Sequence, residues 1–587
     1  CPICDQGGEC DLQDQAMAYG YHSSRYREEK RAVPDKEFGP IVKTEMTRCI
    51  QCTRCVRFAT EIAGVEVLGA TGRGEHMEIT TYVEKTINSE LSGNLVDLCP
   101  VGALTSKPYA FIARPWELRK TQSIDVMDAV GSAIRLDSRG REVLRILPRV
   151  NDDVNEEWLA DKSRYAVDGL RRQRLDRPYL RIDGKLTPVS WPEALDAVAK
   201  RLTGVQGSRI AAIAGDFADA EAMFALKGLM TALGSPNIDC RQEGAALDPK
   251  ARASWLFNST IAGIEKADAI LIVGSNPRWE APVLNARIRK RYLKGGLKVG
   301  VIGPKLDLTY PYQHLGQTAD VLGQVATHAF GDVLKNAKAP MLILGQGALR
   351  GPEGAAVLGL ARKLAESCNL VREGWNGFNV LQTAAARVGG MEVGFVPQAN
   401  GRDVAGILDG AARGEIEVVY LLGADEIDMT RLGKAFVIYQ GHHGDAGAHR
   451  ADVILPAAAY TEKSGIYVNT EGRAQMTEPA IEPLGEARPD WAILRALSET
   501  LGKTLPYDTL DQLRRALFKA APNLQQLGAV VPAKWESFGG SGAVTARAFH
   551  LPIANYYMTD PISRASETMA KCTDAFVATA TGTGTHG

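Results

Sequence analysis

Four cysteine side chains have the spacing of ligands to a cubane iron–sulfur cluster. Cys49, Cys52 and Cys55 form a C-x2-C-x2-C run, and Cys99 follows after 43 further residues, directly before Pro100. Two-residue gaps let successive thiolates reach neighbouring corners of one cluster, and a remote Cys-Pro supplies the fourth corner. A structural zinc ion also takes four thiolates, but it usually takes them from two C-x2-C knuckles. The spacing therefore favours a 4Fe–4S cluster, with zinc as the alternative.

Three more cysteines near the start of the sequence indicate a second cluster. Cys1, Cys4 and Cys10 form a C-x2-C-x5-C run, which is one ligand short of a complete site. His22 or a residue upstream of position 1 could supply the fourth ligand, and the upstream position is favoured. The sequence begins with a cysteine and not with methionine, which predicts that the natural N-terminus lies further upstream. Two cuboidal clusters held close together would conduct electrons.

The remaining cysteines and the composition are those of an ordinary globular protein. Cys240, Cys368 and Cys572 are scattered, so each is predicted to be a buried apolar thiol. The 68 basic and 69 acidic residues give a net charge of −1, which offers no footprint for nucleic acid. No run of 18 apolar residues occurs, so the sequence predicts no membrane span. Clustered cysteines favour metal ligation in a reducing compartment over disulfides.

The 587 residues are too many for a single core, and the sequence pattern changes along the chain. Residues 1–112 are rich in cysteine and glycine and predict a small domain with a partly inorganic core. Residues 113–170 are strand-like. The clearest strand patterns there are 132–136 and 143–147. Residues 171–504 form the large domain and residues 505–587 a smaller appendage, whose end, 579–587, is predicted to be disordered.

One theme repeats through most of the large domain: a short apolar run that ends in glycine, followed by a helical pattern. The apolar runs are 210–215, 270–274, 341–345 and 418–423. The helical partners include 218–233, 281–293 and 353–367. Buried strands that alternate with helices predict parallel sheets covered on both faces. Ligands of such sheets bind where the strands end, but no G-x-G-x-x-G fingerprint for a nucleotide occurs at these ends.

Three motifs resemble the large iron–sulfur subunit of respiratory complex I, the proton-pumping NADH:quinone oxidoreductase. They are residues 1–15, residues 48–57 and residues 97–104. The resemblance covers essentially the whole chain. It implies that Cys1, Cys4 and Cys10 hold a second 4Fe–4S cluster with a histidine just upstream of position 1. It also implies a ferredoxin-like domain with a 2Fe–2S cluster further upstream.

The same resemblance implies a subunit that transfers electrons and has no substrate site of its own. It would receive electrons from the flavin- and NADH-binding subunit and pass them through 4Fe–4S clusters to the quinone-side iron–sulfur subunits, toward ubiquinone. The other peripheral-arm subunits of complex I would be its partners, and it would meet the membrane only through the complex. Its place would be the cytoplasmic side of the bacterial inner membrane, or the matrix side of the mitochondrial inner membrane.

Residues 114–500 resemble the molybdopterin-enzyme fold of formate dehydrogenases and nitrate reductases, which implies an α/β multidomain fold for the whole chain. The matching segments are 274–277, 282–287, 451–457 and 469–473. Active members hold a 4Fe–4S cluster on C-x2-C-x3-C and a cysteine about 27 residues further on. The corresponding residues here are Asp125, Asp128, Ser132 and Ala160, which carry no sulfur. Residues 113–170 are therefore predicted to be a vestigial domain without a cluster.

A working molybdenum site would need a metal ligand and a neighbouring cluster. Cys240 lies near the expected ligand position but a few residues early. His442 and His443 are predicted to supply polarity at the surface or in a pocket. No bound molybdenum is expected, and the large domain is predicted to be a scaffold and docking surface. The alternative function is a molybdenum-dependent, NAD-linked formate dehydrogenase, which would share the cysteine-rich front end.

Overall fold

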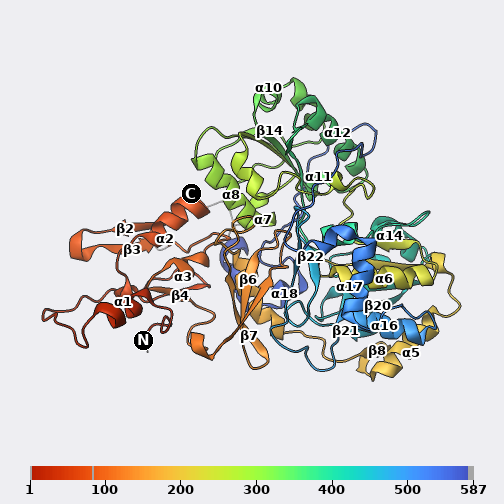
Figure 1. The fold of residues 1–587 in the computed structure, drawn as a ribbon, viewed down its shortest axis with the longest axis horizontal. Coiled ribbons are helices and arrows are strands. Elements are labelled where there is room, and N and C mark those ends of the chain that lie inside the picture. Colours follow the sequence, from red (N-terminus) through yellow and green to blue (C-terminus); the bar gives the residue numbers. More distant parts are fainter. Residues whose placement is uncertain (1–2, 82–84, 579–587) are drawn as a thin grey trace.

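The computed structural model describes residues 3–81 and 85–578, which form three lobes (Figure 1). The cysteine-rich lobe, red in the figure, lies at one side. Beyond an orange antiparallel sheet lie a green lobe around a five-stranded sheet and a larger yellow-to-blue lobe around a seven-stranded sheet. The helices of the described part of the chain include none that is long and apolar enough to cross a membrane.

The cysteine-rich lobe consists of short elements joined by loops. Its two small antiparallel sheets pair β1 (Val42–Thr44) with β4 (Leu104–Ser106), and β2 (Leu68–Thr71) with β3 (Glu78–Thr81). Its helical segments are α1 (Asp11–Tyr19), η1 (Met46–Arg48), α2 (Arg54–Arg57), η2 (Phe58–Ala63), η3 (Gly74–His76) and α3 (Asn94–Leu98). One buried cluster of apolar side chains joins this lobe to the orange sheet, and it contains the thiols of Cys10 and Cys99.

A three-stranded antiparallel sheet connects the cysteine-rich lobe to the rest of the chain. Its strands are β5 (Arg119–Ile124), β6 (Ala133–Arg139) and β7 (Glu142–Pro148). Helices α4 (Asp161–Tyr165) and η6 (Ala166–Arg171) follow the sheet. The strands predicted at 132–136 and 143–147 are confirmed, because alternating apolar residues such as Ile134 and Leu136 turn into the core.

Two sheets carry the large domain. The seven-stranded sheet runs in the order β11 (Asn237–Asp239), β10 (Ile210–Ala214), β19 (Val418–Leu422), β20 (Phe436–Gly441), β21 (Val453–Pro456), β8 (Tyr179–Ile182), β9 (Lys185–Pro188). The five-stranded sheet runs in the order β14 (Gln313–Gly316), β13 (Lys298–Ile302), β12 (Ala269–Val273), β15 (Pro340–Gly345), β18 (Phe378–Leu381). The five-stranded sheet is parallel throughout, and only β8 and β9 break the parallel order of the other.

Helices cover these sheets as the sequence pattern predicts. The helices are α5 (Trp191–Leu202), α6 (Ala220–Ala232), α7 (Pro277–Glu280), α8 (Pro282–Leu293), α10 (Ala329–Asn336), α11 (Gln346–Leu349), α12 (Gly354–Ser367), α13 (Ala385–Glu392), α14 (Val404–Ala412), α15 (Ala446–Arg450), α16 (Asp490–Thr500) and α17 (Leu510–Ala520). All four predicted apolar runs are buried strands, and the three predicted helical partners are α6, α8 and α12. The predicted α/β multidomain fold with parallel sheets is confirmed.

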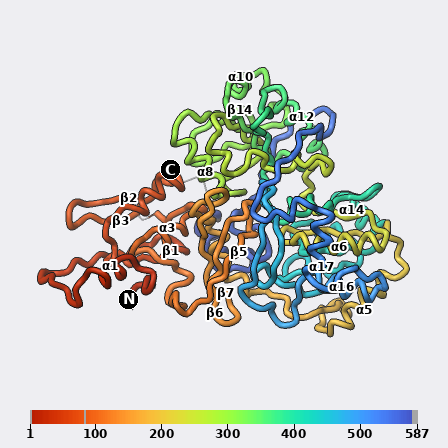
Figure 2. The backbone as a smooth tube through the Cα atoms, in the orientation of Figure 1, coloured from red at the N-terminus to blue at the C-terminus, as the bar shows by residue number. Residues whose placement is uncertain are grey.

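The C-terminal part of the chain returns to the cysteine-rich side. Helices α18 (Pro561–Ala565) and α19 (Glu567–Thr573) pack against η6 and α4, and their blue segment can be followed in Figure 2. The hydroxyl of Tyr556 accepts a hydrogen bond from the backbone N–H of Lys162 at 3.3 Å. Phe576 belongs to the same buried cluster as Cys10 and Cys99. The predicted disorder at 579–587 falls outside the described residues.

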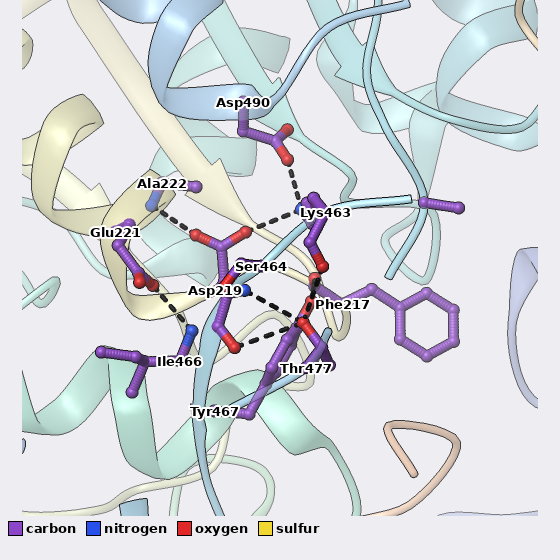
Figure 3. Close-up of polar contacts among 12 residues, drawn as sticks. Phe217, Asp219, Glu221, Ala222, Lys463, Ser464, Ile466, Tyr467, Thr477 and Asp490 are labelled. Atoms are coloured by element: carbon purple, nitrogen blue, oxygen red, sulfur yellow. Dashed lines mark hydrogen bonds and ion pairs between the residues drawn. The ribbon is translucent and has the colours of Figure 1, made fainter. Parts of the chain in front are cut away.

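A buried lysine ties together three segments of the seven-stranded lobe. The Lys463 ammonium pairs with the carboxylate of Asp219 at 2.7 Å and with that of Asp490 (Figure 3). Asp219 is the N-cap of α6 and also accepts from the backbone N–H of Ala222 at 2.7 Å. All three charged side chains are less than a tenth exposed, so their charges are compensated mainly by one another.

Candidate metal centre

The cysteines at positions 49, 52, 55 and 99 line one cavity in the cysteine-rich lobe. The first three lie around η1 and α2, and the fourth directly follows α3. The other walls are mostly apolar: Met46, Ile50, Ile79, Pro100, Val101, Ala103 and Leu104. Cys99 is only 8% exposed, whereas Cys52 lies at the surface. The fold therefore brings together all four side chains that the spacing grouped.

The loop before α2 turns sharply on both sides of Cys52. Gln51 has φ +50° and Thr53 has φ +61°, so both occupy the left-handed region that residues with a Cβ seldom adopt. The backbone N–H of Gln51 lies 3.4 Å from the Cys49 sulfur. Each such conformation costs about 1–3 kcal/mol and persists where the surroundings or a bound group hold it. The turns fold the loop around the cavity.

The thiols lie close enough to influence one another electrostatically. Burial, and then the neighbouring thiols of Cys99, Cys49 and Cys52, raise the pKa of Cys55 to about 12. Burial also raises the pKa of Cys99, while the backbone amides after it, at Val101, Leu104 and Ala103, act in the opposite direction. Amide donors aimed at sulfur stabilise a thiolate, and a coordinated metal deprotonates a thiol outright.

The donor set of this cavity fits an iron–sulfur cluster. Four soft thiols in a mostly apolar pocket are what such clusters select, and a cluster spreads its ligands over separate iron corners. Within residues 3–81 and 85–578, no three His, Cys, Asp or Glu side chains are grouped so that they could hold a single metal ion.

The second cysteine set lies directly behind the Cys99 turn. Cys4 and Cys10 are 7% and 9% exposed, and Cys1 falls outside the described residues. A Cβ built on Gly102 would lie 2.3 Å from the Cys4 sulfur, so the two residues are in close contact. The backbone N–H of Asp11 donates to the carbonyl of Pro100 at 3.0 Å. The two sets are therefore joined through one short stretch of chain.

Gly102 was not identified as a site residue from the sequence. Its signal was present, because it is a glycine three residues after Cys99 in a Cys-Pro-Val-Gly run. Only glycine permits such a close approach of backbone and sulfur. His22, the alternative fourth ligand of the second set, is exposed.

The four positions without sulfur are buried in a polar network. Asp125, Asp128, Ser132 and Ala160 are between 1% and 4% exposed. The backbone N–H of Asp125 donates to the Ser132 carbonyl at 2.8 Å, and the Ser163 hydroxyl donates to the Asp125 carboxylate at 2.6 Å. Burial, and then the neighbouring Asp128, raise the pKa of Asp125 to about 7. Hydrogen bonds therefore hold these positions, at which the sequence predicts no cluster.

The residues weighed for a molybdenum site do not converge. Cys240 is fully buried, and a Cβ on Gly390 would lie 2.6 Å from its sulfur. His443 is fully buried as well, and its Nε2 contacts the Gly169 carbonyl at 2.8 Å. Burial lowers the pKa of His443 to about 3. The prediction that this histidine lies at the surface or in a pocket is wrong, because it is a packed interior side chain.

Cys368 and Cys572 are also fully buried, as Cys240 is, so all three predicted apolar thiols are confirmed as buried.

Sequence families match consecutive parts of the chain. The molybdopterin oxidoreductase family matches residues 174–500. The ferredoxin-like domain of NADH-quinone oxidoreductase subunit 3 matches residues 39–105, and the iron-sulfur binding region of NADH-ubiquinone oxidoreductase-G matches residues 1–25. A 4Fe-4S domain of the NADH-ubiquinone oxidoreductase NDSU1/NuoG type matches residues 118–168, a stretch without cysteine. The C-terminal family of the NADH-ubiquinone oxidoreductase G subunit matches residues 525–572.

Individual relatives are similar over nearly the whole chain. The NADH-quinone oxidoreductase G subunit of Rickettsia bellii is 50% identical over 577 residues, which is 98% of this chain and 83% of the relative. The protein of the same name in Rickettsia felis is 51% identical over 98% of this chain and 84% of its own length. The mitochondrial NADH dehydrogenase [ubiquinone] iron-sulfur protein 1 of Solanum tuberosum is 51% identical over 97% of this chain and 77% of its own length.

A solved structure, acetylene hydratase from Pelobacter acetylenicus, is 13% identical with a TM-score of 0.48, covering 65% of this chain and 69% of that chain. This likeness is too weak to support any conclusion about the chain.

The cysteine-rich lobe and the large α/β domain together define an iron–sulfur protein with a molybdopterin-oxidoreductase-type domain. The chain belongs to the family of the NADH-quinone oxidoreductase G subunit. These relatives do not favour the alternative of a formate dehydrogenase.

Proposed function

We propose that this chain is an electron-transfer subunit of complex I, the NADH:quinone oxidoreductase. It passes electrons through 4Fe–4S clusters from the flavin-bearing subunit toward quinone. The observation that carries the proposal is the four-cysteine cavity, with the second cysteine set in contact with the same turn of chain. The names of the relatives, which share about half of their residues with this chain, support the same activity.

In this proposal Cys49, Cys52, Cys55 and Cys99 hold one 4Fe–4S cluster. Cys1, Cys4 and Cys10 hold a second, with a histidine upstream of position 1, and a 2Fe–2S cluster lies in a further upstream domain. The clusters supply the one-electron chemistry when bound. The protein supplies the thiolates, an apolar wall that excludes water, and amide N–H groups that face the Cys99 sulfur.

The chain also fixes the separation of the two sites. The Asp11 N–H to Pro100 carbonyl hydrogen bond and the Cys4–Gly102 contact hold one ligand loop against the other. An ion pair between Arg54 and Asp11 at 3.8 Å spans the same junction at the surface, where it contributes little energy. Electrons could then pass between the two sites without leaving the chain.

The large domain serves as a scaffold in this proposal. Residues 1–112 form the cluster domain, residues 113–170 the vestigial domain, residues 171–504 the molybdopterin-oxidoreductase-like domain, and residues 505–587 the C-terminal part. We propose no molybdenum, because the two aspartates, the serine and the alanine buried at the vestigial positions cannot replace thiolates.

The partners in this proposal are the other peripheral-arm subunits of complex I, namely the flavin- and NADH-binding subunit on one side and the quinone-side iron–sulfur subunits on the other. The chain meets the membrane only through them. The peripheral arm would face the bacterial cytoplasm or the mitochondrial matrix.

Substitution of a single ligand tests the proposal. Cys52→Ser in the assembled complex should remove one cluster's iron, abolish its electron paramagnetic resonance signal and stop NADH:quinone turnover. Cys368→Ser, which changes a buried cysteine far from the cavity, should keep the iron and the signal. Metal analysis of the anaerobically purified protein separates iron from the zinc alternative. Full iron content and turnover in Cys52→Ser would refute the assignment.

A further inference from the structure

A cleft remains open in the large domain between its two parallel sheets. Two adjoining cavities of about 510 and 790 Å³ form it, and they share the side chains of Gln242, Glu243 and Arg431. Asp216 and Glu426 reach the cleft from the loops that follow β10 and β19. The carboxyl ends of parallel strands are where open α/β sheets bind their ligands. In the molybdopterin oxidoreductase family, the ligand implied by the fold is an anionic pterin nucleotide.

Three of the helix starts at this cleft are already occupied by the chain's own carboxylates. Asp403 accepts from the backbone N–H of Gly406 at 2.9 Å at the start of α14, and Asp560 accepts from that of Ser563 at 2.9 Å at the start of α18. Glu280 accepts from the backbone N–H of Asn276 at 2.6 Å. Free N–H groups at helix starts are what bind phosphate. Three of the helix starts that could attract an anionic nucleotide therefore carry negative charge, and an anionic pterin does not fit these three. The starts of α12 and α13, which also reach the cleft, have no side-chain cap.

The residues that line the cleft include more acidic than basic side chains. Its acidic residues are Asp216, Asp239, Glu243, Asp248, Glu280, Asp403, Glu426, Asp428 and Asp560, and its basic residues are Lys162, Arg241, Arg350 and Arg431. Arginines behind the lining compensate part of the excess, since Arg387 bridges Asp216 and Glu243, and Arg564 pairs with Glu426. Counting these two arginines, the carboxylates still outnumber the cations.

At the wall that the two cavities share, two buried hydrogen-bond acceptors have no partner among the described residues. Gln242 is 5% exposed and donates its amide N–H groups to Asp216 at 2.6 Å and to Glu426 at 2.9 Å. Its carbonyl oxygen, like Oε1 of Glu243, has no hydrogen-bond partner among the described residues. The unmatched donors nearby belong to Arg350 and Arg387, which already face Glu243 electrostatically. A buried acceptor without a donor destabilises the folded protein, so a ligand rich in N–H groups would be stabilised here.

We propose that this cleft binds a linear organic polycation, a polyamine, in place of the anionic pterin nucleotide that its fold implies. The acidic side chains come from the segments after β10, β11 and β19, from α7, and from the residue before α18, so they are spread along the cleft and do not surround one point. A chain of separated ammonium groups matches that distribution, whereas a single metal ion does not. This inference is independent of the electron-transfer proposal.

Binding of a polycation should release protons from two carboxyl groups that line the cleft. Burial raises the pKa of Glu280 to about 7 and that of Glu426 to about 8, so both hold part of their protons at neutral pH. A cation bound beside them lowers both pKa values and expels protons. Binding at pH 7 should therefore release protons, and affinity should rise between pH 6 and pH 8.

Calorimetric titrations of the full chain with spermidine test the proposal. ADP serves as the anionic comparison and Mn²⁺ as the metal comparison. We expect saturable binding of spermidine, proton release that is visible as a dependence on the buffer's ionisation enthalpy, and no binding of ADP. Glu426→Gln should weaken spermidine about three- to tenfold, because it removes one close charge. Glu482→Gln, which changes an exposed carboxylate outside the cleft lining, should bind as the unaltered chain does.

Titrations of the unaltered chain test the proposal even if Glu426→Gln fails to fold. Binding of ADP, binding of Mn²⁺ without spermidine, or no spermidine binding would each overturn the proposal. Spermidine binding without proton release would place the ligand elsewhere on the surface and would overturn it as well.

Discussion

The sulfur of Cys4 packs against the α-carbon of Gly102 so closely that a methyl group there would lie 2.3 Å from it. This contact joins the loop of the second cysteine set to the turn that carries Cys99. Because Gly102 has no unusual φ, its role is purely one of space. The junction between the two proposed clusters therefore depends on a missing side chain.

Gly102→Ala should displace Cys4 and lower the occupancy of the second cluster. Overpacking of this kind destabilises the folded state by about 1–3 kcal/mol. We expect the loop that carries Cys4 to move before the Cys99 turn does. Iron content and electron paramagnetic resonance of the anaerobically prepared full-length subunit would measure the loss. Gly69→Ala is the matched control, because nothing lies within 4 Å of the added carbon. An unchanged second cluster in Gly102→Ala would contradict the argument.

Removal of iron should loosen the cysteine-rich lobe and spare the large domain. Cys10 and Cys99 belong to the buried cluster of the first lobe, and Cys49 and Cys55 pack against it. Loss of the metal would therefore remove the bonds by which these thiolates link separate segments of the lobe. Limited proteolysis before and after anaerobic chelation would show new cuts within residues 1–112. Equal digestion of both forms, or new cuts mainly in 171–504, would speak against a role of the metal in stability.

Asp125→Asn should leave the iron content unchanged and alter only the pH dependence of stability. The native pKa of Asp125 is about 7 against an ordinary value of 3.8, so the folded protein binds a proton that the unfolded chain releases between these values. Stability of the unaltered protein therefore falls as pH rises through this window, and asparagine removes that fall. Urea unfolding at pH 5 and pH 8 measures the difference, which should favour the variant at pH 8.

The matched control for this experiment is Asp183→Asn, at an exposed turn. If Asp125→Asn lost iron, the vestigial site would instead be part of a working cluster.

Lys463→Met should be strongly destabilising, because it leaves the carboxylates of Asp219 and Asp490 buried without their cationic partner (Figure 3). Breaking a buried ion pair from one side costs about 3–5 kcal/mol. Burial raises the pKa of Asp490 and Lys463 opposes that rise, so its loss makes the carboxyl still easier to protonate. The penalty should be larger at pH 8 than at pH 5, as denaturant unfolding would measure. A penalty independent of pH would mean that lost packing dominates.

Periodicity in the sequence was sufficient to predict the sheets. The runs at 210–215 and 418–423 became adjacent parallel strands because a strand buried on both faces must be apolar throughout. The strand order could not be predicted, since pairing of β10 with β19 joins residues far apart in the chain. The prediction for His443 was wrong for a related reason. Only the tertiary packing shows that its ring contacts the Gly169 carbonyl in the interior.

The cysteine spacing predicted which thiols lie together, because two-residue gaps constrain a loop locally. It could not predict the left-handed turns at Gln51 and Thr53 or the contact between Cys4 and Gly102. Both features depend on how the loops pack in three dimensions. Gln and Thr give no signal of a left-handed turn, and the only signal of the contact was the glycine three residues after Cys99. The helix-capping carboxylates of the cleft were missed in the same way, since an N-cap aspartate looks alike whether or not a cleft faces it.

Tyr556, Met569 and Phe576 complete the buried cluster that encloses the first cysteine set. These residues are among the last that a ribosome adds to the described chain, whereas Cys49 and Cys99 are among the first. The cysteine-rich lobe must therefore wait until residues 556–576 have been synthesised to reach its final packing. A chain without residues 556–576 would leave the buried cluster around Cys10 and Cys99 incomplete, so the order of translation itself sets when the core of this lobe can close.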